Sequence, residues 1–127
     1  SKEKQTERVI RALDNRRVNI FGHPSGRLIN ERPGYEIDLD KVMKAAVERG
    51  CYLELNSHPD RLDLDDVHCR SAKAMGLKVA LSTDAHSRDD LDLMRYGIGQ
   101  ARRGWLEPAD IINTRPLTEL HKLLKRT

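Results

Sequence analysis

The chain has 127 residues, of which 34% are charged and 4% are aromatic, and its formal net charge is +3. This composition is ordinary for a soluble α/β protein and excludes a disordered chain. No apolar run approaches the ~20 residues that a membrane span requires, and no signal-peptide pattern opens the sequence. We therefore expect one domain, or part of one, that is large enough to bury a core.

Positive charge gathers near both ends of the chain, which weakly indicates polyanionic partners such as DNA, although solvated helix faces give the same pattern. The two cysteines, Cys51 and Cys69, lack the spacing of a disulfide framework and indicate buried thiols in a reducing, cytoplasmic compartment. Because the chain opens at Ser1 inside a helical pattern, we expect it to be a piece of a longer protein. The basic residues near the ends are Arg8, Arg11, Arg16, Arg17, Arg102, Arg103, Lys122, Lys125 and Arg126.

The first half of the chain alternates helical and strand patterns. Asp38 occupies the place of a helix N-cap and Gly50 that of the C-terminal glycine, with apolar residues at helical spacing between them. A polar loop rich in Gly, Pro and Arg covers residues 25–35. The expected elements are helices over residues 2–15 and 38–50 and strands over residues 18–21 and 51–55.

The second half continues this alternation. Asp63 is expected to cap the third helix, whose buried face includes Val67 and Ala74. Gly97 and Gly99 are expected to break the helical pattern that follows the third strand. The remaining expected elements are a strand over residues 77–81, a helical turn near 108–110, an apolar pair at 111–112, and a last helix with Pro116 in its first turn and Leu117, Leu120 and Leu124 inside.

Helices and strands therefore alternate one by one, an order that requires right-handed crossovers and parallel strands. The strands are short and apolar, which fits a sheet covered on its outer face by helices. We expect an α/β fold with parallel strands and helices outside.

Each predicted strand ends in polar side chains of the kinds that bind metal ions. His23 follows the first strand, Glu54 and Asn56 lie at the end of the second, and Asp84 and His86 follow the third. The carboxyl ends of parallel strands share one face, where the sites of α/β proteins are built. Any one of these residues could be a cap or turn residue, but three such strand ends in succession favour a metal or phosphate site.

Asp84 and His86 are two residues apart, so in extended backbone they would point into one cavity as ligands of a divalent metal ion. The alternative is an Asp that caps the next helix beside a surface His. His58 precedes a proline in the loop after the second strand and could reach the same face. Arg27 and Arg61, in the loops after the first two strands, suit phosphate oxygens, although two solvated arginines would look the same.

Four segments, in this order and spacing, resemble the polymerase and histidinol phosphatase (PHP) superfamily. They are Gly22-His23-Pro24, Leu53-Glu54-Leu55-Asn56, Arg61-Leu62-Asp63-Leu64 and Thr83-Asp84-Ala85-His86. The stretch from Tyr96 to Leu106, with Asn113-Thr114, resembles more closely the C-terminal PHP domain of bacterial and archaeal family X DNA polymerases. The resemblance covers essentially the whole chain.

This resemblance implies a distorted seven-stranded, TIM-like α/β barrel with up to three Mn²⁺ or Zn²⁺ ions at its C-terminal mouth. His23, Asp84 and His86 match ligands of three different ions of that cluster, whereas Glu54 and Asn56 match the strand end that lines the pocket. The implied reaction is metal-dependent phosphoester hydrolysis, including 3′ to 5′ trimming of DNA ends without sequence preference, in a polymerase that also contains other domains.

PHP domains also begin with a His-x-His strand and contribute a bridging Glu, which do not occur in this sequence. We therefore expect residues 1–127 to be a single partial domain, the C-terminal half of a PHP domain, with an incomplete metal cluster. The upstream half would be its natural partner. A half-barrel exposes two sheet edges, so we expect the fragment to self-associate unless they are covered.

Two other functions are compatible with the residues. The chain could be a non-catalytic module that completes the polymerase and holds DNA through phosphate contacts of its basic ends. It could also be a small-molecule phosphatase of the histidinol-phosphate phosphatase type, although the match around Gly104-Trp105 argues against this. Metal titration tests the first alternative, and assays on DNA ends and small phosphomonoesters test the second.

Overall fold

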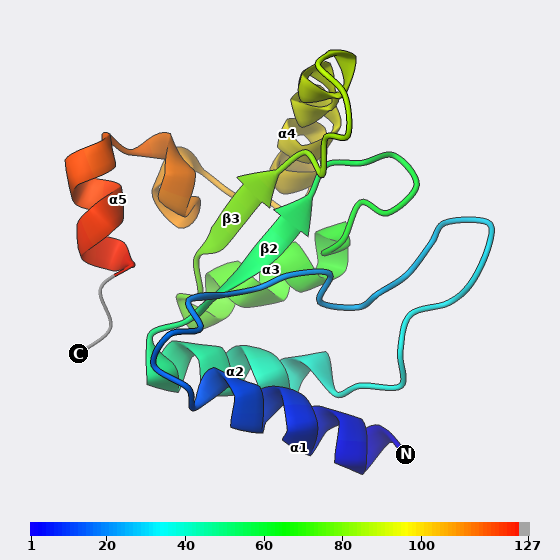
Figure 1. Ribbon diagram of the computed structural model, residues 1–127, viewed down its shortest axis with the longest axis vertical. Coiled ribbons are helices and arrows are strands. Elements are labelled where there is room, and N and C mark those ends of the chain that lie inside the picture. The colour runs from blue at the N-terminus through cyan, green and yellow to red at the C-terminus, as the bar shows by residue number, and fades with distance from the viewer. Residues whose placement is uncertain (125–127) are drawn as a thin grey trace.

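A computed structural model describes residues 1–124, so Lys125 and Arg126 of the basic C-terminal group lie outside the described residues. The predicted alternation of helices and strands is confirmed (Figure 1). The elements are α1 (Lys2–Leu13), β1 (Ile20–Phe21), α2 (Leu39–Arg49), β2 (Tyr52–Asn56), α3 (Asp66–Met75), β3 (Val79–Ser82), α4 (Met94–Arg103) and α5 (Leu117–Leu123), with short 3₁₀ segments η1 (Asp89–Leu93), η2 (Pro108–Asp110) and η3 (Ile112–Thr114).

The strands form one parallel sheet in the order β1-β2-β3, as predicted. Helices α1 to α4 lie side by side, each packed on the next, while α5 stands apart on the other side of β3 (Figure 1). Leu53 and Leu55 of β2 are fully buried in the hydrophobic core, whereas Tyr52 and Glu54, which point to the opposite face of the sheet, are only partly buried. The second face of the sheet is therefore where polar side chains gather.

Helix α2 has the ends that its sequence predicts. The Asp38 side chain accepts a hydrogen bond from the backbone N–H of Lys41 at 3.1 Å, and Gly50 adopts a left-handed conformation with φ 69°. On the face between them, Val42 and Met43 are completely buried. Local signals at both ends and a regular apolar stripe were sufficient to define this element.

The prediction for α3 is wrong at its start and on its face. Asp65, not Asp63, is the N-cap, and its carboxylate accepts a hydrogen bond from the His68 backbone N–H. Val67 is 66% exposed and Ala74 is exposed, because the side buried against α2 and α4 carries Cys69 and Ala72 instead. Burial raises the pKa of the Cys69 thiol to about 12, so this predicted buried thiol stays protonated.

The glycines of α4 do not break the helix, contrary to the prediction. Gly97 lies inside α4 and is buried where the helix crosses the ends of β2 and β3. A Cβ atom at Gly97 would overlap the Ser57 hydroxyl and lie 2.8 Å from Cδ1 of Leu81. Gly97 is thus required by close packing rather than by a turn.

Replacing Gly97 with alanine should destabilise the chain by about 1–3 kcal/mol, because the added methyl group overpacks a filled site. Gly99 is the matched control, since a Cβ there meets nothing within 4 Å in the same helix. Gly99→Ala should stabilise the helix by up to about 1 kcal/mol. Urea unfolding of both variants measures the difference, and equal stabilities would contradict this packing argument.

The free edge of β3 is covered, so the prediction of two exposed sheet edges is wrong on this side. Ile111 forms a parallel bridge with Val79. The side-chain amide of Asn113 then acts like a strand partner: it accepts from the Leu81 N–H at 2.9 Å and donates to the Leu81 carbonyl at 2.7 Å. On the opposite side, β1 has no further strand partner among residues 1–124.

Helix α5 has no buried residue. The prediction that Leu117 lies inside is wrong, since Leu117 is 66% exposed and Pro116 precedes the helix rather than lying in its first turn. The Tyr52 hydroxyl ties the helix to the sheet by donating to the Leu123 carbonyl at 3.0 Å. No helix within residues 1–124 is long and apolar enough to cross a membrane.

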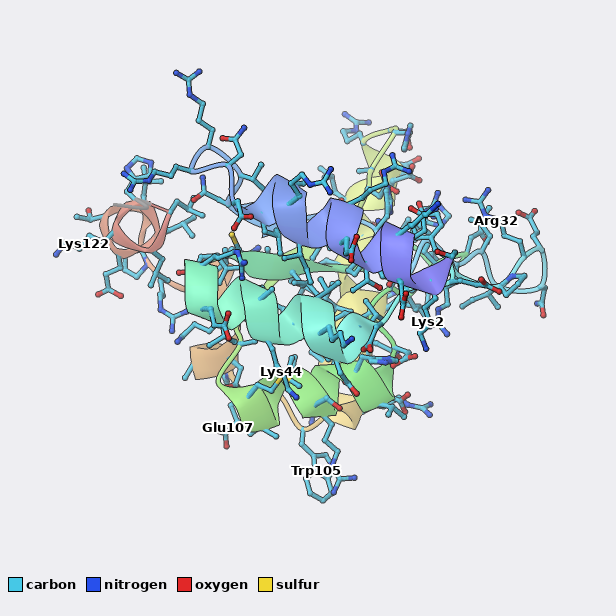
Figure 2. The ribbon with its side chains drawn as sticks, turned by 90° about the horizontal axis from the view of Figure 1, so that it is seen from below. Lys2, Arg32, Lys44, Trp105, Glu107 and Lys122 are labelled. Carbon is cyan, nitrogen blue, oxygen red and sulfur yellow. The ribbon has the colours of Figure 1, made fainter. Side chains whose placement is uncertain are left out.

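Two lysines and a tryptophan on the surface mark different sides of the described residues (Figure 2). Figure 2 shows Lys2, on α1, and Lys122, on α5, at opposite sides of the molecule. In the same view Trp105 projects into solvent, where the guanidinium group of Arg70 stacks on its ring at 3.8 Å from the centroid.

Candidate functional site

The carboxyl ends of the three parallel strands bring the predicted polar side chains together. The backbone N–H of His23, two residues after β1, donates to Oε2 of Glu54 on β2 at 2.8 Å. Asn56, the last residue of β2, donates from Nδ2 to Oδ2 of Asp84, two residues after β3, at 3.1 Å. We call His23, Glu54, Asn56 and Asp84 the strand-end cluster.

His23 and Asp84 face each other across this cluster. Nε2 of His23 lies 3.9 Å from Oδ2 of Asp84, and Nδ1 of the same ring lies 3.9 Å from Oε2 of Glu54. Nδ1 is buried and has no hydrogen-bond partner among the described residues. Both distances are too long for hydrogen bonds, so the imidazole lies between two carboxylates without bonding to either.

His23 and Asp84 also share an uncommon backbone conformation. Their φ angles are +45° and +56°, in the left-handed region that residues other than glycine seldom adopt. Such strain persists only where the surrounding structure enforces it, and it concentrates at functional sites. Here the bonds from Glu54 and Asn56 hold the two turns in place.

The donor atoms of His23 and Asp84 suit a divalent metal ion. Zinc binds imidazole nitrogen at about 2.0–2.1 Å and carboxylate oxygen at about 2.0–2.2 Å, so two ligands of one ion lie about 3.3–3.5 Å apart at a tetrahedral angle and up to about 4.3 Å apart at wider angles. The 3.9 Å between Nε2 and Oδ2 falls within that span. Within residues 1–124, however, no group of three or more His, Cys, Asp and Glu side chains is arranged to hold a metal ion. The pair fits part of a metal site.

His86 does not join the strand-end cluster. Its exposed ring turns back on the chain, with Nδ1 2.7 Å from the carbonyl oxygen of Asp84, and its backbone N–H donates to Asp90. The prediction that Asp84 and His86 point the same way from extended backbone is wrong, because β3 ends at Ser82 and Asp84 is left-handed.

His58 lies at the edge of the site, in the loop after β2. Its backbone N–H donates to Oδ1 of Asn56 at 2.9 Å, and its Nδ1 accepts from the Asp60 N–H at 3.2 Å. The half-buried ring of His58 is therefore engaged by its own loop, and His58 supports the turn that follows Asn56.

The chain is similar in sequence to proteins whose names describe phosphoester chemistry. It is 42% identical over 120 residues to the DNA polymerase/3′-5′ exonuclease PolX of Bacillus subtilis strain 168, a match that covers 94% of the chain and 21% of PolX. The chain is a homologue of part of PolX. This confirms the resemblance to the family X DNA polymerases.

Probable phosphatases match the PolX homologue more distantly. A probable phosphatase of Thermoanaerobacter sp. strain X514 is 30% identical over 118 residues, which are 88% of this chain and 46% of that protein. One from Caldanaerobacter subterraneus is 34% identical over 90 residues, or 66% of this chain and 33% of that protein. No family model matches the chain. The chain thus spans about a fifth of PolX and less than half of these phosphatases.

The two arginines of the PolX homologue differ in their surroundings. Nε and Nη2 of Arg27 donate to the carbonyl groups of Arg61 and Leu62, at 2.8 and 2.5 Å, so this guanidinium joins two loops. Arg61 reaches the strand-end cluster, where its Nε lies 4.0 Å from Oδ2 of Asp84. Arg61 is thus the better placed of the two to meet an anion bound beside Asp84.

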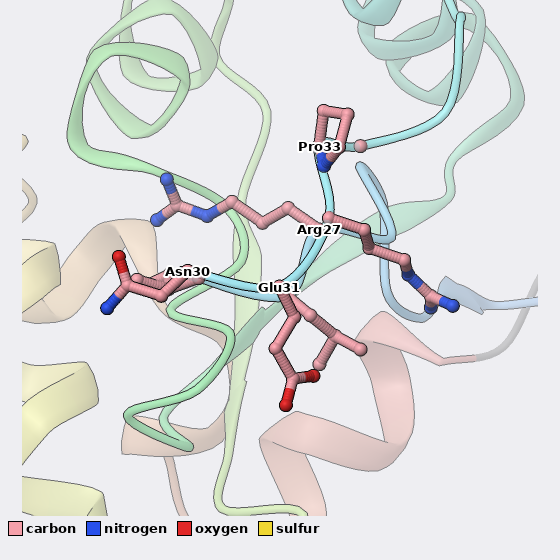
Figure 3. Close-up of a pocket in the computed structure, with 8 residues that line it drawn as sticks. Arg27, Asn30, Glu31 and Pro33 are labelled. Atoms are coloured by element: carbon pink, nitrogen blue, oxygen red, sulfur yellow. The ribbon is translucent and has the colours of Figure 1, made fainter.

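A pocket of about 450 Å³ lies on the loop that carries Arg27 (Figure 3). Residues 27–34 line it, including Asn30, Glu31 and Pro33. None of these belongs to the strand-end cluster, so this pocket and the candidate site are separate features. The site itself is open to solvent, since the His23 side chain is 40% exposed.

Asp63 is a residue of the site region whose role the sequence reasoning missed. It is completely buried, and its carboxylate accepts from the Ser25 N–H at 3.1 Å and the Gly26 N–H at 3.0 Å. Its backbone also exchanges hydrogen bonds with Asn56. Asp63 thus fixes the loop after His23 to the end of β2. The sequence signal for this role is the position of Asp63 between two apolar residues, Leu62 and Leu64.

Proposed function

We propose that the chain is the C-terminal part of a PHP-type phosphoesterase domain that hydrolyses DNA 3′ ends within a family X polymerase. The observation that carries this proposal is the pairing of His23 and Asp84 at the strand ends, beside Arg61, in a homologue of a named 3′-5′ exonuclease. The imidazole and the carboxylate would supply two metal ligands, and the guanidinium group, 4.0 Å from the carboxylate, would supply a cation for phosphoryl oxygens.

In this proposal His23 Nε2 and Asp84 bind divalent metal, Mn²⁺ or Zn²⁺, of which the intact domain holds up to three. The metal supplies Lewis acidity and an activated water for attack on phosphorus. Asn56 orients the Asp84 carboxylate through its 3.1 Å hydrogen bond. Arg61 neutralises phosphoryl oxygens, and Arg27 positions Arg61 by holding its carbonyl. The bond from Nδ1 of His86 to the Asp84 carbonyl leaves Nε2 as the nitrogen of His86 that would bind metal.

The open sheet fits a fragment of the seven-stranded barrel that we propose for the parent domain. The outer edge of β1 has no strand partner within residues 1–124, and Ile111 already marks a fourth parallel position beside β3. The upstream half of the domain would pair with β1 and supply the missing ligands. Without the upstream half, self-association would occur at the outer edge of β1. A cytoplasmic location remains part of the proposal.

Parent protein assayed with Mn²⁺ on single-stranded DNA should release nucleotides from the 3′ end, and EDTA should stop the reaction. Histidinol phosphate and p-nitrophenyl phosphate should be hydrolysed at least about 100-fold less efficiently per kcat/KM. The probable phosphatase relatives make a small-molecule phosphatase the second candidate, and the opposite preference would select it. No hydrolysis of either substrate with Mn²⁺ or Zn²⁺ would favour the non-catalytic DNA-docking module.

A further inference from the structure

We infer that Glu54 is a positioning residue that fixes the tautomer of His23, so that Nε2 is the ring nitrogen presented beside Asp84. The inference rests on the proposed function only in taking His23 and Asp84 as metal ligands. It assigns Glu54 a role distinct from lining the pocket: its carboxylate acts on the imidazole rather than on the ion.

The carboxylate of Glu54 is held by the chain's own groups at both oxygens. Oε1 accepts from the Ser82 hydroxyl at 2.5 Å, and Oε2 accepts from the His23 backbone N–H at 2.8 Å. The Glu54 side chain is only 15% exposed. With both oxygens occupied, the carboxylate is fixed in orientation and is turned toward His23.

Glycine at position 22 leaves room for this carboxylate. A Cβ atom at Gly22 would lie 3.3 Å from Oε2 of Glu54, closer than most Cβ contacts. The turn at Gly22 and His23 therefore closes over the carboxylate, and the left-handed backbone of His23 directs its N–H onto Oε2.

The His23 ring completes the arrangement. Nδ1 is buried, has no partner among residues 1–124 and lies 3.9 Å from the same Oε2. A closure of about 1 Å gives an ordinary hydrogen bond and satisfies this buried nitrogen. In that hydrogen bond the carboxylate oxygen accepts and Nδ1 carries the proton, which leaves the lone pair of Nε2 directed at the Asp84 side. A carboxylate that orients a ligating histidine in this way raises metal affinity.

The test compares Glu54→Leu, which removes the acceptor at similar size, with Glu54→Gln, whose carbonyl oxygen can still accept from Nδ1–H. Long-range ¹H–¹⁵N spectra of the metal-free chain, at a pH where imidazoles are neutral, report which ring nitrogen is protonated. We expect His23 to be the Nδ1–H tautomer in the wild type and in Glu54→Gln, and to lose that preference in Glu54→Leu. Ser82→Ala should keep it, because Oε2 is untouched.

Mn²⁺ affinity of the parent protein, followed by electron paramagnetic resonance, is the second measurement. Glu54→Leu should weaken binding about 10–100-fold, and Glu54→Gln should restore most of it. A wild-type His23 protonated at Nε2, or an unchanged tautomer in Glu54→Leu, would overturn the inference. If the tautomers behave as expected but the parent binds no Mn²⁺, the role of Glu54 stands and the proposed metal-dependent function fails.

Discussion

Replacing Asp84 with alanine in the parent protein is expected to abolish Mn²⁺-dependent hydrolysis of DNA 3′ ends while leaving nucleotide polymerisation unchanged. The Asp84 carboxylate faces Nε2 of His23 at 3.9 Å and has Nε of Arg61 at 4.0 Å. Its removal deletes the proposed metal ligand and the negative charge that faces Arg61. We expect the hydrolysis rate to fall by about 1,000-fold or more.

Backbone strain at position 84 complicates the alanine substitution. Asp84 has φ +56°, and alanine tolerates that conformation less well than aspartate, at a cost of about 1 kcal/mol. The substitution Asp84→Asn avoids this problem, since asparagine adopts left-handed backbone readily and its amide oxygen can still accept from Asn56. Asp84→Asn should therefore be as inactive as Asp84→Ala but nearly as stable as the wild type.

Asp92→Ala is the matched control, because Asp92 is an exposed carboxylate a short distance along the chain in η1. It should retain full hydrolysis. Exonuclease rates on 3′-labelled DNA and primer extension, measured on the same preparations, give the comparison. Substantial nuclease activity in both Asp84 variants would show that the assignment of Asp84 is wrong.

The sequence predicts an element well where its signals are local. Helix α2 has a capping Asp38, a left-handed Gly50 and a regular apolar stripe between them, and all three behave as expected. Helix α3 was misjudged because Asp63 and Asp65 are both plausible caps. Val67 and Ala74 are apolar residues at helical spacing, yet the buried side of α3 carries Cys69 and Ala72. Which of two neighbouring aspartates caps a helix depends on what buries the other, and that is a tertiary contact.

The candidate site was also predictable only in the part that does not depend on tertiary contacts. The rule that parallel strands end on one face was sufficient to predict that His23, Glu54, Asn56 and Asp84 would meet. It could not predict the left-handed turn that separates Asp84 from His86, because that turn is enforced by contacts from another strand. Whether the residues bind metal stays a prediction.

The second large effect is expected at Asp63, where alanine should destabilise the chain by about 2–6 kcal/mol, because the substitution leaves the backbone N–H groups of Ser25 and Gly26 without their acceptor. Each unsatisfied buried donor costs about 1–3 kcal/mol. The loop from His23 to Gly26 should loosen as a result, since the Asp63 carboxylate joins it to the end of β2. Urea unfolding, with hydrogen exchange of the Gly26 amide, measures both effects.

Asp63→Asn separates the hydrogen bonds from the charge. Oδ2 accepts from both N–H groups, so an amide oxygen in its place keeps most of the bonding and the loss should be about 1 kcal/mol. Burial raises the pKa of Asp63 above its ordinary value, because desolvation outweighs the hydrogen bonds from Ser25 and Gly26.

The direction of the Asp63 pKa shift determines whether the contribution of Asp63 to stability rises or falls with pH. An acid whose pKa is higher in the folded state binds more protons there. Its contribution is therefore fully present below the ordinary value of about 3.9 and is lost as the pH rises through the folded value. The stability advantage of the wild type over the Asp63→Asn variant should thus shrink as the pH rises above about 3.9, in urea unfolding of the two proteins. An advantage that grows with pH would mean that the N–H groups of the loop stabilise the ionised carboxylate more than burial penalises it, reversing the direction of the shift.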